Sequence, residues 1–296
     1  MIVFDGYAFA QQREVELARR VVALGRQLKI AAVLFIEDKG SQLYTGLKKQ
    51  AAERVGMAYE VHEFSVTDPI EQVTAVIDQL GQDERVTGII IQKPWRKTWE
   101  TAMQHVTAEE EALGQDFAQW WNRLVSRIPE GKDVDGLHPK TLEAVERGTW
   151  REEGKVLPAT AKAVLSILEA HHYLKPQKYI VLGKSDILGK PLSFELRNRG
   201  FEVEMLGRKE LATRVESGIT LQDADVVISA TGQMHLVTGD MIKERAVLVD
   251  VGEPRPDIDR VSVEEKAAFL TPVPGGVGPV TVMSLLENAV ELRQHQ

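Results

Sequence analysis

The sequence contains no cysteine, no cluster of histidines and no block of basic residues. Without cysteine, disulfides and thiolate chemistry are excluded. The seven histidines are scattered, so the sequence indicates no zinc site and no resident metal. Lys and Arg together number 36 against 44 Asp and Glu, which gives a net charge of −8. Nucleic-acid binding by a charged face is therefore not expected, and an anionic ligand would need a local group of Lys and Arg.

Long apolar runs are also missing. The first 20 residues lack the apolar core of a signal peptide, and no stretch reaches the length that crosses a bilayer. We therefore expect no membrane association and a cytoplasmic location. The 296 residues are 43% hydrophobic and 27% charged, as in ordinary globular proteins. At about 150 residues per domain, this length predicts two domains.

The most constrained stretch is 270–282, which reads LTPVPGGVGPVTV. Proline fixes φ and glycine admits positive φ, so this loop has a set shape with bare main-chain edges. A tight surface turn is the simple alternative. A strand-like segment precedes the loop and a helix-like segment follows it, which is the position where open α/β sheets bind ligands.

The first half of the chain alternates between helix and strand patterns. The apolar spacing predicts a helix over 10–29, a strand over 31–37 and a turn at Lys39-Gly40. Ser41 is then expected to cap a helix that ends near Val55. Further patterns predict a strand over 59–64, a helix over 70–80 and a strand over 86–92.

Four side chains of this half are candidates for a site. Tyr44 and Lys48 are spaced i,i+4, which places a phenol and an ammonium on one helix face. Gln92 and Lys93 lie at the carboxyl end of the strand 86–92, where parallel sheets place functional groups. Lys48 and Gln92 together could position a water molecule. The alternatives are a lysine that lies over an aromatic ring and a glutamine that caps a turn.

The stretch 95–130 holds four of the five tryptophans. A single helical stripe is indicated by Phe117, Trp120, Trp121, Leu124, Val125 and Ile128. Such a stripe most often packs against its own domain; a lid or a dimer contact is the alternative. Next comes GKDVDGLHP, in which Asp133 and Asp135 could cap the local backbone. The sharper hypothesis is that one aspartate accepts hydrogen bonds from a donor-rich heterocycle.

The second half predicts a doubly wound parallel sheet with helices between its strands. After a helix from Pro158, the segment KYIVLGKSDILGKP reads as strand, glycine loop and helix start. Gly183 and Gly189 bracket this loop, a candidate phosphate site at a helix N-terminus. A further strand is expected in FEVEMLGRKE (201–210), and two more over 224–231 and 246–252.

The end of the second strand of this half discriminates between cofactors. An NAD site would place an Asp or Glu there, whereas an arginine accommodates a 2′-phosphate. The chain instead has Arg208 and Lys209. These two residues favour NADP.

Several segments together resemble the bifunctional methylenetetrahydrofolate dehydrogenase/methenyltetrahydrofolate cyclohydrolase family. They are SQLYTGLKK, GIIIQKP, KDVDGLHP, LGKSDILGKP, VDVG and TPVPGGVGPVT, in the family's order and over nearly the whole chain. The resemblance implies a two-lobed α/β fold with a folate-binding catalytic domain over 1–153 and a Rossmann-like NADP domain over 154–280. The helix 281–296 would return to the first lobe, with folate between the lobes of a homodimer.

The resemblance also implies roles for individual residues. Tyr44 would stack on the pterin, Lys48 would catalyse with support from Gln92, and Asp135 would bind the pterin's amino edge. Folate would also contact Lys93, Pro274, Gly275 and Gly276. The cofactor would be held by Gly183, Lys184, Ser185, Arg208, Lys209, Gly232, Glu253 and Thr281, with Thr281 at the start of the closing helix.

The chemistry fits these groups. Hydride transfer from the methylene carbon to the nicotinamide requires alignment of two rings more than an acid or base. The resulting methenyl cation takes up water, and a lysine in a partly desolvated cleft can assist the proton removal. The sequence thus predicts oxidation of methylenetetrahydrofolate followed by hydrolysis to 10-formyltetrahydrofolate.

Four departures from the family pattern leave alternatives open. The chain reads IQKPWR where the family has VQLPLP, has Glu253 after DVG, has PATAK for a Cys-Thr-Pro segment, and has a longer connection from Gln92 to Lys132. The alternatives are an enzyme with one of the two activities, an enzyme for a modified pterin, and a non-catalytic binding protein. A dehydrogenase of a small acid would not need the KDVDG and PGGVGP loops together.

Overall fold

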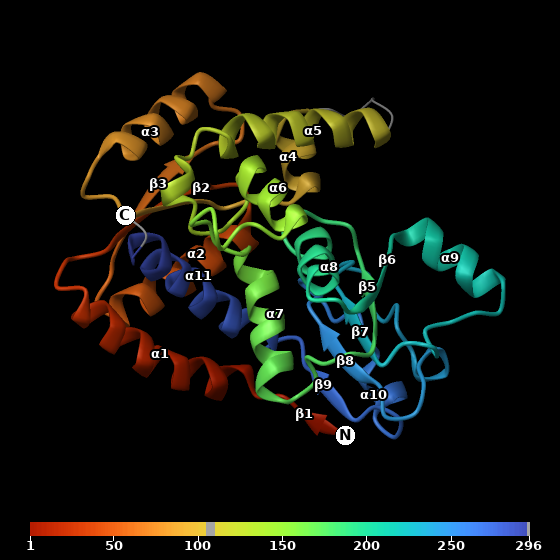
Figure 1. Cartoon of the computed structure of the whole chain (residues 1–296). Helices are drawn as coiled ribbons and strands as arrows, with labels where there is room; N and C mark the ends of the chain where they lie inside the picture. The colour runs from red at the N-terminus through yellow and green to blue at the C-terminus, as the bar shows by residue number, and fades with distance from the viewer. Residues whose placement is uncertain (105–109, 295–296) are drawn as a thin grey trace. The chain divides into compact units, whose positions relative to one another are not determined.

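The computed structural model describes residues 1–104 and 110–294, which form two compact units (Figure 1). Each unit is built on a parallel sheet, so the predicted α/β class with a doubly wound sheet is confirmed. The larger-sheet unit contains Met1–Arg13, Ala144–Arg151 and Leu157–Leu285. The smaller-sheet unit contains Glu14–Glu143, Glu152–Val156 and the chain from Leu286 onward. The functional domain limits at 153/154 and 280/281 stay predictions.

The smaller sheet has three strands in the order β3-β2-β4. Its strands are β2 (Lys29–Phe35), β3 (Ala58–Phe64) and β4 (Gly88–Ile91), and its helices are α2 (Lys39–Arg54), α3 (Ile70–Gln82), α4 (Arg96–Ala102) and α5 (Glu110–Val125). The short η1 (Glu130–Lys132) follows. β2 is central and almost wholly buried, which explains its unbroken apolar run. The chain passes from β2 to β3 on one side and then to β4 on the other. The strand order therefore reverses between β2 and β4.

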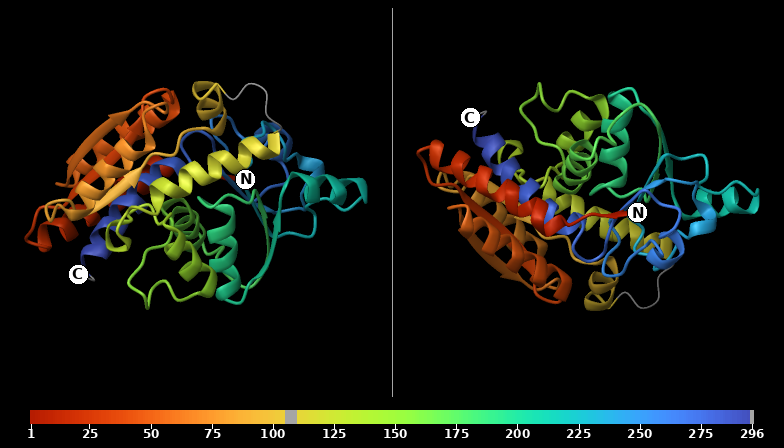
Figure 2. Two further views of the ribbon diagram at one scale, coloured as in Figure 1. Left: turned by 90° about the horizontal axis from the view of Figure 1, so that it is seen from above. Right: turned by 90° about the horizontal axis from the view of Figure 1, so that it is seen from below.

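The larger sheet has six strands in the order β1-β9-β8-β7-β5-β6, all parallel, and each is labelled in Figure 1. Figure 2 gives two further views of the chain. Its strands are β1 (Ile2–Val3), β5 (Lys178–Leu182), β6 (Glu202–Leu206), β7 (Val226–Ser229), β8 (Val247–Asp250) and β9 (Phe269–Thr271). Its helices are α7 (Ala159–Ala170), α8 (Gly189–Asn198), α9 (Arg208–Glu216), η2 (Gly239–Met241) and α10 (Arg260–Val263). Three further helices, α1 (Gly6–Ala23), α6 (Pro139–Arg147) and α11 (Val277–Gln294), contribute residues to both units.

Both faces of the larger sheet are covered by apolar side chains. Successive residues of β5 alternate between two clusters. Tyr179 and Val181 belong to the cluster that contains residues of α7 and α8, and Ile180 and Leu182 belong to the cluster that contains Leu211 of α9. This alternation is what a parallel sheet buried on both faces requires. The order reverses between β5 and β7, the position at which such sheets bind nucleotides.

Several predicted boundaries were wrong for local reasons. The first helix runs from Gly6 to Ala23 rather than over 10–29. Lys39 and Gly40 do not form a turn, because α2 begins at Lys39. The cap of α2 is Asp38 and not Ser41: the Asp38 carboxylate accepts a hydrogen bond from the Ser41 N–H.

Three further corrections concern the connections. The predicted stripe runs past the end of its helix, because α5 ends at Val125 and Ile128 follows it. The stretch 95–130 also contains α4, and residues 105–109 lie outside the described part of the chain. The connection from β7 to β8 contains the short 3₁₀ turn η2 where a helix was expected. The closing helix begins at Val277, so Thr281 lies one turn inside it.

The aromatic stripe on α5 packs as the simpler interpretation predicted. Its members other than Trp120 are less than 9% exposed, and Trp120 contacts Phe35 of β2 at 5.0 Å between ring centroids. Phe117 and Trp120 stack on each other, and both rings contact Trp99 of α4 at tilted angles. These aromatic residues belong to the core of the smaller-sheet unit.

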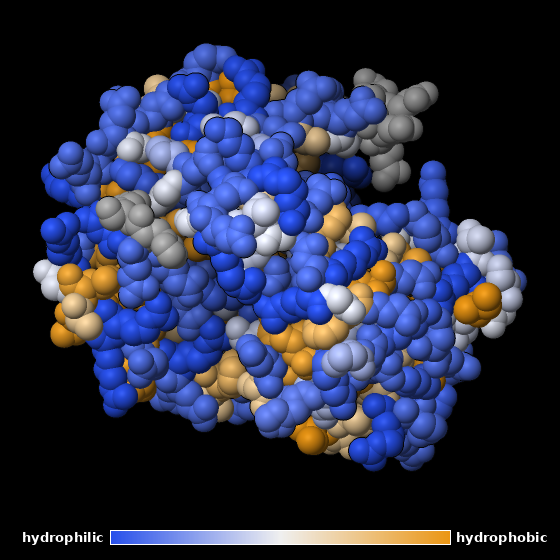
Figure 3. Space-filling model, viewed as in Figure 1, coloured by the Kyte–Doolittle hydropathy of each residue, from blue (hydrophilic) through white to orange (hydrophobic). Residues whose placement is uncertain are grey.

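Hydrophilic residues dominate the face drawn in Figure 3, where apolar residues occur in separate patches. Among the described helices, none combines the length and the hydrophobicity needed to cross a bilayer. The described residues also contain no group of three or more His, Asp or Glu arranged to hold a metal ion.

Candidate active site

The predicted pair of Lys48 and Gln92 is joined by a direct hydrogen bond. Lys48 is only 6% exposed, and its Nζ donates to Gln92 Oε1 at 2.7 Å. Gln92 follows β4, and its backbone N–H donates to Val33 O of β2, which extends the ladder by one residue. The pair therefore stands at the carboxyl end of the smaller sheet, where its strand order reverses.

The N-terminus of α2 is tied to the chain that follows β4. One Asp38 oxygen accepts from Ser41 N at 2.7 Å and the other accepts from Trp95 N at 2.8 Å. Ser41 Oγ also donates to Lys93 O at 3.3 Å. These bonds fix α2 against the segment that carries Gln92. Asp38 was not predicted from the sequence, although an Asp directly before a helix pattern is an N-cap signal.

The two aspartates of KDVDG have different tasks. Asp133 is 1% exposed and accepts hydrogen bonds from the backbone N–H groups of 136, 137 and 138 and from Thr141 Oγ1. Asp133 thus has the capping role that the simpler interpretation gave. Asp135 is half-buried. Burial raises the pKa of the Asp135 carboxyl, and the nearby charge of Lys48 opposes that rise.

Close packing fixes the backbone between these aspartates. A Cβ on Gly88 would lie 2.3 Å from a methyl group of Val134, so only glycine lets this segment lie against β4. Asn288 of α11 is fully buried and donates to Val134 O at 3.0 Å. The sequence analysis missed Asn288. A polar residue on the apolar face of a helix is the signal that could have identified it.

Tyr44 and Lys93 lie near the same end of the smaller sheet. Tyr44 is half-buried on α2, one turn before Lys48. The Lys93 ammonium lies 4.9 Å from the centroid of the Trp121 ring and 5.5 Å from that of Phe117. Cation–π contacts of this kind hold an ammonium in place without neutralising its charge.

The glycine loop of the larger sheet lies at the reversal between β5 and β7. Gly183 has φ of +110°, and a Cβ there would lie 2.6 Å from Ala230 O. A Cβ on Gly189, the first residue of α8, would lie 1.9 Å from Gly183 O. Both positions therefore require glycine. Ser185 is exposed in this loop, and its Oγ accepts from Leu188 N at 3.3 Å.

The predicted phosphate-binding cations lie just beyond β6. Arg208 and Lys209 are exposed in the first turn of α9. Lys184 forms an ion pair with Glu210, whose other oxygen accepts from Gly207 N at 3.0 Å. The hydrogen bond from Lys184 is the main reason why the pKa of Glu210 lies below its usual value. Glu210 thus holds the end of β6, the loop cation and the start of α9 together.

Gly232 and Glu253 are brought close to each other although they follow different strands. A Cβ on Gly232 would lie 3.4 Å from Glu253 O, and Gly232 has φ of +68°. Gly232 is exposed and Glu253 half-buried. These residues follow β7 and β8 at the carboxyl end of the larger sheet.

The constrained stretch identified first forms a short turn between β9 and α11. Pro274 is exposed, and Gly275 has φ of +95°. Gly6 N donates to Gly275 O at 2.9 Å, and a Cβ on Gly276 would lie 2.5 Å from Pro272 O. Thr281 lies within α11, where its Oγ1 donates to Val277 O at 3.2 Å. The expected strand-to-helix position of this loop is confirmed.

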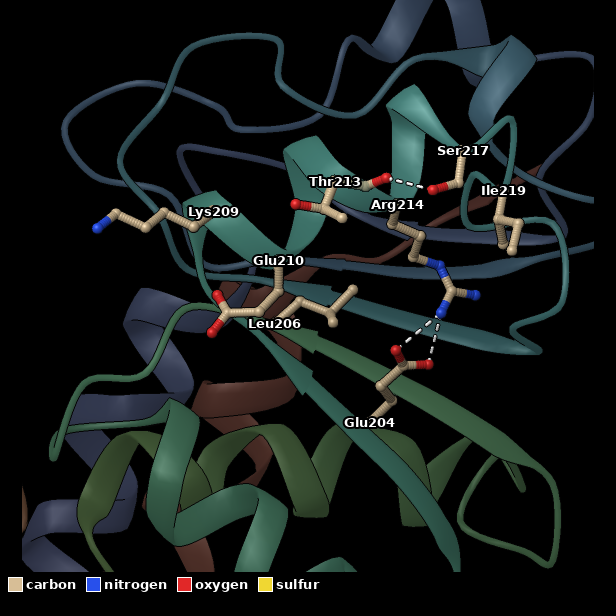
Figure 4. A pocket seen from close by; sticks show the side chains of 8 residues that line it. All are labelled: Glu204, Leu206, Lys209, Glu210, Thr213, Arg214, Ser217 and Ile219. Carbon is tan, nitrogen blue, oxygen red and sulfur yellow. Dashed lines mark hydrogen bonds and ion pairs between the residues drawn. The ribbon is translucent and has the colours of Figure 1, made fainter.

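A surface hollow on the edge strand β6 is distinct from the Lys48–Gln92 pair (Figure 4). It is lined by Glu204, Leu206, Lys209, Glu210, Thr213, Arg214, Ser217 and Ile219. Arg214 forms ion pairs with Glu204 inside it and with Asp223. Figure 4 shows the Lys209 side chain extending away from the Glu204–Arg214 pair. Within the hollow, Glu204 pairs with Arg214 and Ser217 Oγ donates to Thr213 O, whereas Glu210 pairs with Lys184 outside it.

These features define a two-unit α/β protein with a dinucleotide-binding type of sheet in one unit and a buried lysine–glutamine pair in the other. Residues 4–110 match the family "Tetrahydrofolate dehydrogenase/cyclohydrolase, catalytic domain", and residues 158–296 match the NAD(P)-binding domain of the same name. The chain belongs to the tetrahydrofolate dehydrogenase/cyclohydrolase family. The predicted resemblance to the bifunctional enzymes is confirmed.

Individual relatives agree along the whole chain. The "Bifunctional protein FolD" of Lactobacillus helveticus is 33% identical, over 99% of this chain and 98% of its own length. A crystal structure of the bifunctional enzyme FolD, methylenetetrahydrofolate dehydrogenase/cyclohydrolase, from Campylobacter jejuni is 29% identical with a TM-score of 0.82 and full coverage of both chains. The Trypanosoma brucei enzyme, solved with NADP cofactor and inhibitor, is 28% identical with a TM-score of 0.82 over 99% and 97% of the chains.

Proposed function

We propose that this protein oxidises methylenetetrahydrofolate with NADP and hydrolyses the methenyl product to 10-formyltetrahydrofolate. The observation that carries the proposal is the 2.7 Å hydrogen bond from Lys48 Nζ to Gln92 Oε1, near the half-buried Asp135 carboxyl. Hydride transfer alone has little need of such a pair. Its presence supports the second, hydrolytic activity.

In this proposal, the smaller-sheet unit binds the folate. Asp135 would accept hydrogen bonds from the amino edge of the pterin, since Asp133 is already occupied by four donors. Tyr44 would stack on the pterin ring. Lys93, held over Trp121 and Phe117, would face the anionic part of the substrate. Pro274, Gly275 and Gly276 would supply a rigid main-chain edge.

The hydrolytic step depends on proton transfer. When water attacks the methenyl carbon, one of its protons must leave, and the neutral form of a lysine amine can take it. Gln92 cannot remove a proton from Lys48 but accepts a hydrogen bond from it, so the amide orients the amine without consuming its basicity. Lys48 lies on α2, and Gln92 follows β4 with its backbone N–H bonded to Val33 O of β2, so both groups are held in place.

NADP would lie on the larger sheet at the reversal between β5 and β7. When bound, it accepts the hydride on its nicotinamide ring. Gly183 and Ser185 would approach the pyrophosphate, and Arg208, Lys209 and Lys184 would meet the 2′-phosphate. Gly232, Glu253 and Thr281 would contact the nicotinamide half. The bare backbone at Gly183 and the exposed cations at the start of α9 fit these tasks.

We also propose that the enzyme is a cytoplasmic homodimer, with support from the family resemblance. Sedimentation equilibrium of the purified protein tests the dimer, and a monomer at assay concentration would refute it. Cell fractionation with an antibody to the chain tests the compartment.

Two assays of the wild-type protein test the activity. We expect reduction of NADP when methylenetetrahydrofolate is added, and loss of methenyltetrahydrofolate absorbance above the uncatalysed rate when that compound is added alone. Reduction without hydrolysis, or hydrolysis without reduction, would reveal an enzyme with one activity. Absence of both, together with no NADP binding in calorimetry, would refute the proposed function.

A further inference from the structure

Two buried carboxylates, Asp250 and Asp257, lie at the carboxyl ends of β8 and β7. Neither has a role in the proposed hydride transfer or hydrolysis. Asp250 is 2% exposed and ends β8; Asp257 is fully buried. Asp250 Oδ1 accepts from Gly252 N at 2.8 Å and from Asp257 N at 3.2 Å, and its Oδ2 accepts from Ile258 N at 2.9 Å. Asp250 therefore holds both ends of the loop 251–257.

Asp257 connects this loop to the end of β7. Its Oδ2 accepts from Ser229 Oγ at 2.8 Å and from Thr231 N and Oγ1 at 2.6 and 2.9 Å. Its Oδ1 is buried and has no hydrogen-bond partner among the described residues. A Cβ on Gly252 would lie 2.7 Å from that oxygen, so Oδ1 is directed at the Gly252 backbone.

Main-chain bonds continue the connection. Val237 N donates to Asp257 O at 3.0 Å and His235 N donates to Pro256 O at 3.1 Å. The loop 230–237 after β7 and the loop 251–257 after β8 are thus joined side by side. They carry Gly232 and Glu253, two residues proposed above to contact the cofactor.

We infer that Asp250 and Asp257 are positioning residues for the cofactor, which together hold the loop 251–257 against the loop 230–237. The inference rests on the proposed NADP-dependent function. A buried carboxylate is costly unless it is well hydrogen-bonded, and purely apolar packing would join two loops at lower cost. Six donated hydrogen bonds, by contrast, define the direction of each loop.

Ionisation adds a measurable property. Burial raises the pKa of the Asp250 carboxyl to about 6, and the charge of Asp257 contributes to the rise. The other groups that contact Asp250 are three backbone N–H groups and, through its main chain, the Thr271 hydroxyl. As the pH falls through about 6, Asp250 takes up a proton and loses acceptor capacity toward the loop. Removing the charge of Asp257 should lower that midpoint.

The test compares three variants of the full-length enzyme. Asp257→Asn keeps the shape of the side chain but replaces the carboxylate, including the Oδ1 that has no partner in the described part of the chain, with a neutral amide. Ser229→Ala removes one donor to Asp257 and leaves every charge in place. Asp223→Asn is the matched control, because it removes a carboxylate charge at the amino end of β7, where Asp223 pairs with Lys178 and Arg214.

For each variant, NADP affinity is measured by calorimetry and the two activities are assayed in parallel. We expect Asp257→Asn to weaken NADP binding by about 10-fold and Ser229→Ala by about 3-fold, with methenyl hydrolysis and the Asp223→Asn control within 2-fold of wild type. On the acid side, the pH at which NADP affinity falls should be about half a pH unit lower in Asp257→Asn than in the wild type. Because a phosphate of NADP titrates in the same range, the difference between variants carries the result.

Two results would overturn the inference while leaving the proposed function in place. One is unchanged NADP affinity in both variants while the wild type binds NADP. The other is an equal loss of both activities with a lower unfolding midpoint, which would show a purely structural role. Failure of the wild type to bind NADP would overturn the inference together with the proposed function, and is distinguished from the first result by the wild-type titration alone.

Discussion

The carboxyl ends of the two sheets differ in function and in the groups that form their sites. At the smaller sheet, side chains carry the site: Lys48, Gln92 and Asp135 are held within bonding or electrostatic reach of one another. At the larger sheet, the backbone forms the site: Gly183 and Gly232 have no side chain to cover the main chain. The buried Asp250 and Asp257 accept hydrogen bonds from the loops that follow β7 and β8.

This difference follows from the two tasks. Proton transfer to or from water needs a titratable group at a fixed place, and side chains on helix and strand provide that. Dinucleotide binding needs close approach to phosphates and a flat ring, which side chains would obstruct. Substitutions at the smaller sheet's site should therefore lower the catalytic rates, whereas substitutions at the larger sheet's site should weaken NADP binding.

The largest contrast is expected between the two aspartates of KDVDG. Asp135→Asn should lower kcat/KM of both activities by about 100-fold, because an amide presents a donor to the pterin's amino edge. Its free energy of unfolding should not fall, because the raised pKa of Asp135 shows that burial disfavours its charge. Steady-state kinetics and denaturant unfolding measure the two quantities.

Asp133→Asn is the matched comparison for that substitution. It should lower the free energy of unfolding by about 2 kcal/mol, because donors now bonded to the carboxylate lose an acceptor. An Asp133→Asn variant that unfolds like wild type but is inactive would mean that the two aspartates had been assigned to the wrong tasks.

A smaller and more selective effect is expected at Arg208. Arg208→Ala should weaken NADP binding by about 20-fold and NAD binding by less than 2-fold, since only NADP carries the 2′-phosphate. Calorimetry with both nucleotides measures the ratio. Arg260→Ala, an exposed arginine on α10, is the control. Equal losses for NADP and NAD would show that Arg208 does not reach the phosphate.

The smallest effect concerns the ion pair between Lys184 and Glu210. Glu210→Gln removes the partner charge of Lys184 and should improve NADP affinity by about 2-fold to 3-fold at low salt. The gain should shrink as ionic strength rises, because both side chains are largely exposed. Weaker NADP binding in this variant would indicate that Glu210 itself contacts the ribose.

The sequence predicted the reactive side chains of the smaller sheet's site better than the residues that hold the surrounding backbone in place. Lys48 and Gln92 could be paired because their types and positions imply proton chemistry, and the family resemblance assigned the same two residues. Asp38 and Asn288 were missed, because each acts by accepting from or donating to a backbone group whose position depends on the fold. Ser41 was proposed as a cap on its residue type, and the geometry gave that position to Asp38.

At the larger sheet, periodicity predicted the strands and the glycine loop but not the links between loops. Asp250 ends β8, and Asp257 lies seven residues later in a loop without regular structure, so no spacing rule connects them. The short η2 replaced an expected helix because the connection from β7 to β8 is built from turns. Strand order, which brings β1 beside β9, depends on long-range pairing that local patterns do not encode.

The most direct test of the account uses Lys48→Met in one reaction mixture with methylenetetrahydrofolate and NADP. In the proposed function, Lys48 takes a proton from the attacking water and the larger sheet binds NADP. The variant should therefore form NADPH and accumulate methenyltetrahydrofolate, with an NADP affinity equal to that of the wild type. Lys49→Met, on the adjacent exposed position of α2, should behave as wild type. Formation of 10-formyltetrahydrofolate at the wild-type rate by Lys48→Met would contradict the account.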